Sequence, residues 1–411
     1  MKSFDFMIEF SLIGFCLFNA ISCQQKVTTS IDRIKSAGFK EEVHKVTTLD
    51  GYVLTLFRIV TSSNNKPKVQ RQHPVLIQHG LMSNSDCFLV DGDGLAFVLA
   101  RDNWDVWLGN IRGNYYSREH TRISPNGTEF WNYSWHEMGQ RDITAMVNYI
   151  LGNTGKARLN YIGHSMGTTM FYVMASTMPS YNKKINTMIS LAPASRMTKW
   201  DFVSNNTTFF YQLVHDELMK YILQKRVEAF PRGEIKGMSK HQVSIEDLDA
   251  LYFKASFGLI NWLVKVLTGD DIFPDGTSLR TLLHYTQNIG AGTFQRFDYG
   301  SGVRNMLAWG TEYPLPYKLN KIQAPVAVYY AVGDEFSSEK DSEYLISKLP
   351  NVVLKMRISA LRFSHADFCF TTAPENLSER RRMHTSIKNL LRQRDDIKKV
   401  CQNKKNCDAK S

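Results

Sequence analysis

Cysteine is scarce in this 411-residue chain, and no two cysteines have the Cys-x-x-Cys spacing of a zinc or dithiol site. The eleven histidines also lack the spacing of a metal-binding cluster. Internal repeats and low-complexity tracts are missing. With 43% hydrophobic and 22% charged residues, the composition is not that of a disordered chain. These absences exclude zinc modules and repeat arrays. The chain length and the hydrophobic content predict one large globular domain with insertions, or two domains.

Long hydrophobic runs are lacking as well. Residues 10–20 form an apolar run that is too short to span a bilayer comfortably, and small residues follow it. This pattern predicts a signal peptide over residues 1–22, cleaved after Ser22 or Cys23, with a membrane anchor as the alternative. The most apolar internal segment, 251–267, is interrupted by two lysines and an asparagine. We therefore expect an exported protein, either secreted or lysosomal.

Five Asn-x-Ser/Thr sequons agree with export, because such sequons accept N-linked sugars in the secretory pathway. They begin at Asn126, Asn132, Asn205, Asn206 and Asn376. An oxidising compartment also permits disulfides, and two pairs of cysteines are candidates for one.

Cys401 and Cys407 flank a short lysine-rich stretch near the C-terminus. They could close a small disulfide loop or remain two free thiols. Cys87 and Cys369 flank loops that we expect near the active site. For this second pair, two buried thiols are expected rather than a bridge, since nothing in the sequence sets the distance between them.

Negative charge is in deficit, with 39 acidic against 50 basic residues and a net charge of +11. The basic residues are spread out except near the C-terminus. An exported chain without a recognition motif is not expected to bind nucleic acid. The positive charge either covers a solvated surface or attracts the protein weakly to an anionic membrane or lipid surface.

What the chain has in quantity is alternation between strand-like and helix-like segments. Strands are expected at 51–60, 73–80, 104–110, 157–162, 185–194, 324–334 and 352–358. The alternation predicts an α/β fold with a mostly parallel sheet and helices on both faces. Residues 130–151 are expected to form a loop that enters a single helix.

From about residue 196 the pattern turns helical and aromatic, with helices expected at 208–226, 251–267 and 277–287. We interpret this insertion as a helical cap over the carboxyl edge of the sheet, where open α/β sheets bind ligands. The predicted division begins with a signal peptide at 1–22 and the first part of the core at 23–195. A cap with a lid follows at 196–321, then the second part of the core at 322–395 and a basic tail at 396–411.

The sequence YIGHSMGTTM contains Ser165 between two glycines. G-x-S-x-G is weak evidence alone, but here a short strand-like segment precedes it and apolar residues at helical spacing follow it. Strand, sharp turn and helix together are typical of a nucleophile elbow. An ordinary serine in a βα loop is the alternative. Gly163 and Gly167 would let the helix and strand approach closely.

A nucleophilic serine needs a base, and the base needs an orienting carboxylate. In a fold with this elbow, the acid follows the serine in the chain and the histidine comes last. Asp334 directly follows a predicted strand, which would fix its position. Glu335 and Asp341 are rivals, but Asp341 is expected in mid-helix and in contact with solvent.

Only His365 and His384 follow these acids. His365 lies in a loop just beyond a predicted strand, whereas His384 lies in a charged helical run and is expected at the surface. The predicted triad is therefore Ser165 as nucleophile, Asp334 as the acid that orients the histidine, and His365 as general base and acid. This chemistry needs no metal or cofactor.

An oxyanion needs two aimed backbone N–H groups. We expect them from Met166, which follows the nucleophile, and from Leu81, in the turn after the strand at 73–80. The turn reads QHGLM, so a side chain stands where many esterases have glycine. His79 is either a positioning residue behind this turn or a packed polar residue at a strand end.

These residues resemble the acid lipase family, which includes gastric and lysosomal acid lipases and invertebrate relatives. The similarity runs from about residue 28 to 391. Its most specific stretches are DVWLGNIRGNYYSREH and GTSLRTLLHYTQNIGAGTFQRFDYG, and HGLMSNSDCF suggests an insect-like member. The resemblance implies an α/β-hydrolase fold with a helical cap and mobile lid, and hydrolysis of triacylglycerols or cholesteryl esters. It places the same roles on Ser165, Asp334 and His365, and the oxyanion donors on Leu81 and Met166.

The chain departs from that pattern in the cap. Mammalian members carry a cap disulfide, whereas no cysteine lies between Cys87 and Cys369 here. The lid segment at 230–270 also differs. The expected partner is lipid at an interface, with transient contact to a membrane or droplet, and the oligomeric state is left open. The alternatives are an esterase for soluble small-molecule esters and a lipid-binding homologue with little activity.

Overall fold

A computed structural model describes residues 28–60, 71–90, 92–198, 228–229, 275–371 and 373–408. The predicted signal peptide, the expected helices at 208–226 and 251–267, and the sequons at Asn205 and Asn206 lie outside these ranges. Within the described ranges, none of the helices combines the length and the apolar composition that crossing a bilayer would need.

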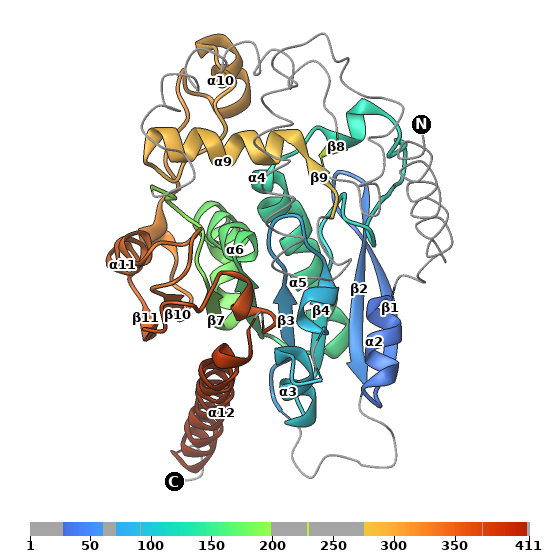
Figure 1. Ribbon diagram of the computed structural model, residues 1–411, viewed down its shortest axis with the longest axis vertical. Helices are drawn as coiled ribbons and strands as arrows, with labels where there is room; N and C mark the ends of the chain where they lie inside the picture. The colour runs from blue at the N-terminus through green and yellow to red at the C-terminus, as the bar shows by residue number, and fades with distance from the viewer. Residues whose placement is uncertain are drawn as a thin grey trace, which may run out of the picture.

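One nine-stranded sheet forms the centre of the protein, with the order β1-β2-β4-β3-β6-β7-β10-β11 and with β5 paired to β2 (Figure 1). The pairs β1–β2, β2–β4 and β2–β5 are antiparallel, and all pairs from β4 to β11 are parallel. The strands are β1 Lys40–Thr47, β2 Tyr52–Val60, β3 Val75–Gln78, β4 Val106–Gly109, β5 Glu119–His120, β6 Leu159–His164, β7 Ile185–Leu191, β10 Val326–Ala331 and β11 Val352–Ile358. The predicted mostly parallel sheet is confirmed, and the carboxyl ends of its parallel strands share one edge.

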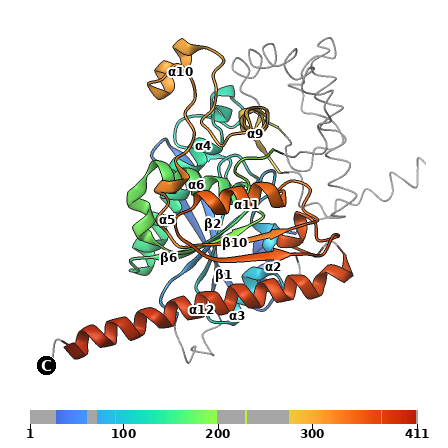
Figure 2. The same ribbon diagram turned by 90° about the vertical axis from the view of Figure 1, so that its left-hand side faces the viewer.

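Helices cover both faces of the sheet because its central strands are apolar on both sides. One face packs against α5, α6 and α11, and the other packs against α2, α3 and α12 (Figures 1 and 2). The helices are α2 Ser30–Ser36, α3 Leu95–Arg101, α5 Thr144–Thr154, α6 Met166–Thr177, α11 Glu339–Lys348 and α12 Leu377–Asp408. Short 3₁₀ turns lie at Ser85–Phe88, Thr128–Trp131, Pro179–Lys184, Leu319–Lys321, Ala366–Phe368 and Pro374–Asn376.

Residues 130–151, which were expected to form a loop and a single helix, form several short elements instead. The segment forms α4 (Trp135–Glu137), then a π-helical turn (Met138–Ile143), and only then α5. The π turn carries Asp142, whose buried carboxylate accepts three hydrogen bonds from Arg112, at 3.0 Å from its backbone N–H and at 2.8 and 2.5 Å from its guanidinium. A buried charge is tolerated when it is paired in this way, and the pairing joins the turn to the loop after β4.

Between β7 and β10 the described chain contributes β8 (Glu228–Ala229), β9 (Thr277–Ser278), α9 (Leu279–Ala291) and α10 (Gly302–Trp309). Figure 1 shows α9 and α10 above the sheet. The helix expected at 277–287 starts at Leu279, because Ser278 caps it by accepting from the N–H of Thr281. The rings of Trp135 and His284 stack at 3.5 Å and join α9 to the core.

Candidate active site

Ser165 occupies a strained turn between β6 and α6. Its φ of 52° and ψ of −119° are unfavourable for a residue with a side chain. The turn is held because the Ser165 N–H donates to Leu191 O at 3.0 Å. Glycine is required at position 167, since a Cβ there would lie 2.4 Å from Gln78 O on β3. The sharp turn thus presents the Ser165 side chain at the edge where the parallel strands end.

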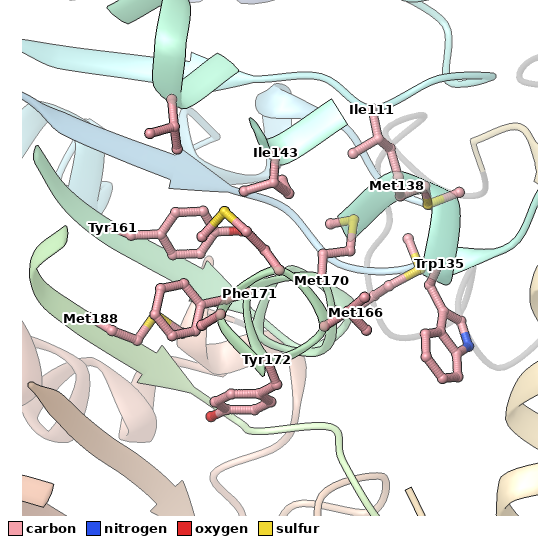
Figure 3. Close-up of a cluster of buried hydrophobic side chains, with 14 of the residues drawn as sticks. Ile111, Trp135, Met138, Ile143, Tyr161, Met166, Met170, Phe171, Tyr172 and Met188 are labelled. Carbon is pink, nitrogen blue, oxygen red and sulfur yellow. The ribbon is translucent and has the colours of Figure 1, made fainter. Parts of the chain in front are cut away.

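The backbone groups predicted to bind an oxyanion lie next to this serine. A Cβ on Gly80 would lie 3.0 Å from Ser165 Cβ, so the Gly80–Leu81 peptide passes directly beside it. Met166 opens α6, where backbone N–H groups lack partners within the helix. Its side chain is fully buried and belongs to the hydrophobic cluster of Figure 3. Both predicted donors therefore belong to residues at the Ser165 turn: Leu81 follows Gly80, which lies beside Ser165, and Met166 is the next residue in the chain.

Asp334 and His365 are brought together from two neighbouring strand ends. Asp334 follows β10 and His365 follows β11, and His365 Nδ1 donates to both carboxylate oxygens of Asp334 at 2.9 Å. Asp334 is buried and also accepts from the N–H groups of Phe336 and Ser337 at 2.9 and 2.7 Å. Burial by itself lowers the pKa of His365, but the charge and hydrogen bond of Asp334 outweigh it and raise that pKa above its ordinary value.

His164 joins the His365 loop to the elbow, a contact that the sequence did not predict. Its Nε2 donates to His365 O at 3.0 Å, and the two rings are 4.7 Å apart. Burial, followed by the charge of His365, holds the pKa of His164 well below its ordinary value. Among the described residues, no hydrogen bond joins the Ser165 hydroxyl to His365. Such catalytic bonds are often long until substrate binds.

Among the described residues, neither rival acid forms a hydrogen bond with the imidazole of His365. Glu335 accepts instead from the backbone N–H of His365 at 3.2 Å. Asp341 was expected in mid-helix and exposed to solvent, which is wrong. It lies in the first turn of α11, is 4% exposed, and accepts from the hydroxyls of Ser338 and Thr198 at 2.8 and 2.7 Å. Ser338 caps α11 by accepting from the Asp341 N–H, and the Asp341 carboxylate anchors the chain that follows β7.

His384 was expected at the surface, and this is also wrong. It is 4% exposed on α12, because α12 packs this side against the sheet through Met383, Ile387 and Leu391. Burial lowers the pKa of His384 to about 3. The helix also continues through Asp408, past the point where the basic tail was expected to begin.

Predicted modification sites have mixed outcomes. Asn126 and Asn132 are exposed, as glycosylation requires. Glycosylation at Asn376 is contradicted, because this residue is 2% exposed and its Nδ2, the atom that would carry the sugar, donates to Arg362 O and Asp367 Oδ2 at 2.8 and 3.0 Å.

Cys87 and Cys369 are free, buried thiols, as expected. Burial, together with contact with the thiol of Cys87, raises the pKa of Cys369. Cys401 and Cys407 both lie within α12. Residues six apart in a helix are separated by about 9 Å along its axis, whereas a disulfide spans Cα atoms no more than about 7 Å apart. Of the two alternatives for Cys401 and Cys407, the disulfide loop does not fit this continuous helix.

Sequence comparisons agree with this geometry. Residues 73–367 match the family described as alpha/beta hydrolase fold, and residues 31–92 match the partial alpha/beta-hydrolase lipase region. Lipase 1 of Drosophila melanogaster is 35% identical over 87% of this chain and 80% of its own length. The gastric triacylglycerol lipase of Bos taurus is 31% identical over 90% of this chain and 94% of its own.

A third relative, the putative lysosomal acid lipase/cholesteryl ester hydrolase of Crotalus adamanteus, is 33% identical over 83% of this chain and 86% of its own length. Among solved structures, a soluble variant of monoglyceride lipase from Saccharomyces cerevisiae superposes with a TM-score of 0.54 at 14% identity. The match covers 90% of this chain and 98% of that one. This likeness supports the fold alone.

Proposed function

The chain belongs to the α/β-hydrolase family of the acid lipases, and from this premise we propose that it hydrolyses ester bonds of neutral lipids, foremost triacylglycerols. One observation carries the proposal. A strained serine and a buried Asp334–His365 pair lie at the ends of strands that share one edge of the sheet. Relatives named as triacylglycerol lipases support the choice of substrate.

In the proposed reaction, Ser165 Oγ attacks the ester carbonyl carbon while His365 Nε2 takes the hydroxyl proton. The negative charge that forms on the carbonyl oxygen is bound by the N–H groups of Leu81 and Met166. His365 then gives its proton to the departing alcohol, which leaves an acyl group on Ser165. Water attacks this acyl-enzyme with the same proton transfers and releases the fatty acid. Asp334 holds the imidazole and stabilises its charged form.

Lipid at an interface is the proposed partner. The expected lid segment lies outside the described residues, but α10 offers a surface of its own. Val303, Met306 and Leu307, spaced three and four residues apart, are 72%, 46% and 84% exposed. Residues at this spacing share one face of a helix, and Figure 2 shows α10 standing away from the sheet. The family and the exposed sequons at Asn126 and Asn132 support export, to the cell exterior or the lysosome.

The test is hydrolysis of a panel of esters, from a soluble butyrate ester to emulsified triolein and cholesteryl oleate, by purified protein between pH 4 and pH 8. The proposal expects release of long-chain fatty acid that rises steeply once substrate forms droplets. Ser165→Ala should lower turnover by roughly 10⁶-fold while the fold is kept, because the triad acts as a unit. Cleavage of soluble esters alone would support the small-ester alternative. Equal activity of parent and Ser165→Ala would reject a serine esterase of either kind.

A further inference from the structure

His79 stands at the end of β3 and is completely buried. Its Nε2 faces two donors, the side-chain amide of Asn114 at 3.1 Å and the backbone N–H of Ile111 at 3.4 Å. A ring nitrogen that faces donors must be the unprotonated acceptor of a neutral imidazole. The proton is therefore on Nδ1, which donates to Gly80 O at 2.8 Å.

This last hydrogen bond acts on a particular peptide unit. Gly80 C=O and Leu81 N–H belong to one planar trans peptide, in which the two groups point in opposite directions. A bond that fixes Gly80 O on the His79 side thus fixes the direction of the Leu81 N–H on the other side. The same peptide passes beside Ser165, since a Cβ on Gly80 would lie 3.0 Å from Ser165 Cβ.

We propose that His79 is a positioning residue that orients the Gly80–Leu81 peptide, so that the Leu81 N–H is aimed at the oxyanion formed beside Ser165. The inference rests on the proposed function. Within a buried chain of hydrogen bonds, each bond polarises the next, so donation to Gly80 O also strengthens Leu81 N–H as a donor. Asn114 selects the tautomer that makes this possible, because its amide donates to the other ring nitrogen.

The remainder of the loop is held independently, which leaves the Gly80–Leu81 peptide as the part that His79 controls. Met82 has a φ of 53°, and its C=O accepts from the N–H of Asp275 at 2.9 Å. Asn84 donates to the buried Asp275 carboxylate, which also accepts from the N–H of Tyr115 at 2.8 Å. The chain entering β9 therefore fixes the far end of the loop. Burial lowers the pKa of His79 to about 4, so the neutral ring and its bond to Gly80 O persist at mildly acid pH.

Two substitutions of His79 test the roles of its two ring nitrogens separately. In His79→Asn the amide nitrogen replaces Nδ1 and keeps donation to Gly80 O. In His79→Gln the amide reaches the Nε2 position, keeps the contact with Asn114, and loses that donation. On a soluble butyrate ester, His79→Gln should lower kcat by about 10²-fold with KM nearly unchanged, as expected when an oxyanion donor is lost. His79→Asn should remain within about tenfold of the parent.

A boronic acid that forms a tetrahedral adduct with Ser165 provides the second measurement. Its affinity should fall in His79→Gln by the same factor as kcat, which a loss of packing alone would not cause. Equal losses in the two variants, or full kcat in His79→Gln, would overturn the inference. If neither variant folds, ¹⁵N NMR of the parent decides: an Nδ1–H tautomer supports the assignment and an Nε2–H tautomer rejects it. A parent without Ser165-dependent activity would instead reject the proposed function.

Discussion

His365 is subject to two opposing influences at the scale of a single residue. Burial disfavours the imidazolium, whereas the Asp334 carboxylate at 2.9 Å favours it, and the balance raises the pKa of His365. The proposed base must be neutral to accept a proton, so activity should be lost as pH falls through this raised pKa.

Asp334→Asn should therefore lower kcat/KM by about 10⁴-fold, because the imidazole loses its orienting anion. The acid limb of the remaining activity should move to lower pH, since burial then acts on His365 without Asp334. A pH profile of kcat/KM on a soluble ester measures both effects. Glu335→Gln is the matched control and should move the limb less, because Glu335 hydrogen-bonds only to the backbone of His365 and its charge raises the pKa of His365 less than Asp334 does. An unmoved limb in Asp334→Asn would contradict the pairing.

His384 shows the opposite behaviour, that of a buried histidine outside the site. Its Nε2 is buried without a hydrogen-bond partner among the described residues. His384→Ala should destabilise the protein by about 2 kcal/mol through the cavity that it leaves, with kcat unchanged. His384→Leu fills the space and removes the unsatisfied nitrogen, so it should be near neutral or stabilising. Thermal unfolding and kcat together test this, and a large loss of kcat in His384→Leu would contradict a structural role.

At the scale of elements, the contact between α6 and β3 depends on one glycine. A Cβ on residue 167 would lie 2.4 Å from Gln78 O and 3.0 Å from His79 O, and backbone atoms cannot yield as a flexible side chain can. Gly167→Ala should push α6 away from β3, lower stability by about 3 kcal/mol, and reduce kcat because Ser165 moves with the helix.

Gly152→Ala is the matched control for this change. Gly152 is an exposed position in α5, and a Cβ there would meet no atom within 4 Å. Alanine is a better helix former than glycine, so this variant should gain about 1 kcal/mol of stability without a change in kcat. Chemical denaturation of both variants measures the difference. Equal effects would show that close packing at the elbow is not the cause.

At the scale of the whole molecule, α10 lies beyond the edge of the sheet at which the parallel strands end, which is also the edge that holds the candidate active site (Figure 1). Val303→Ser combined with Leu307→Ser should weaken binding to triolein droplets about thirtyfold, since two aliphatic side chains lose roughly 2 kcal/mol of burial in lipid. Hydrolysis of a soluble butyrate ester should be unchanged. Val43→Ser on β1, a half-exposed aliphatic residue outside this face, serves as the control. Equal losses on droplets and soluble ester would reject α10 as a lipid contact.

Local sequence pattern was enough to predict the type of sheet and the residues of the candidate triad. Strand-like segments, the G-x-S-x-G turn and the order of serine, acid and histidine are short-range features, because side-chain periodicity and turn chemistry act over a few residues. They predicted the mostly parallel sheet, and they selected Asp334 and His365, which the structure then places 2.9 Å apart. Residues at the ends of parallel strands meet whatever the length of chain between them.

Burial of polar groups was decided only by tertiary structure. Asp341, Asn376 and His384 look like surface residues in the sequence, yet each is at most 4% exposed. Their partners or neighbours come from other elements, as when Thr198 reaches Asp341 across 143 residues. The tautomer of His79 is likewise set by Asn114, 35 residues away. A polar side chain can be buried wherever folding supplies its hydrogen bonds, and no local pattern records which distant group will supply them.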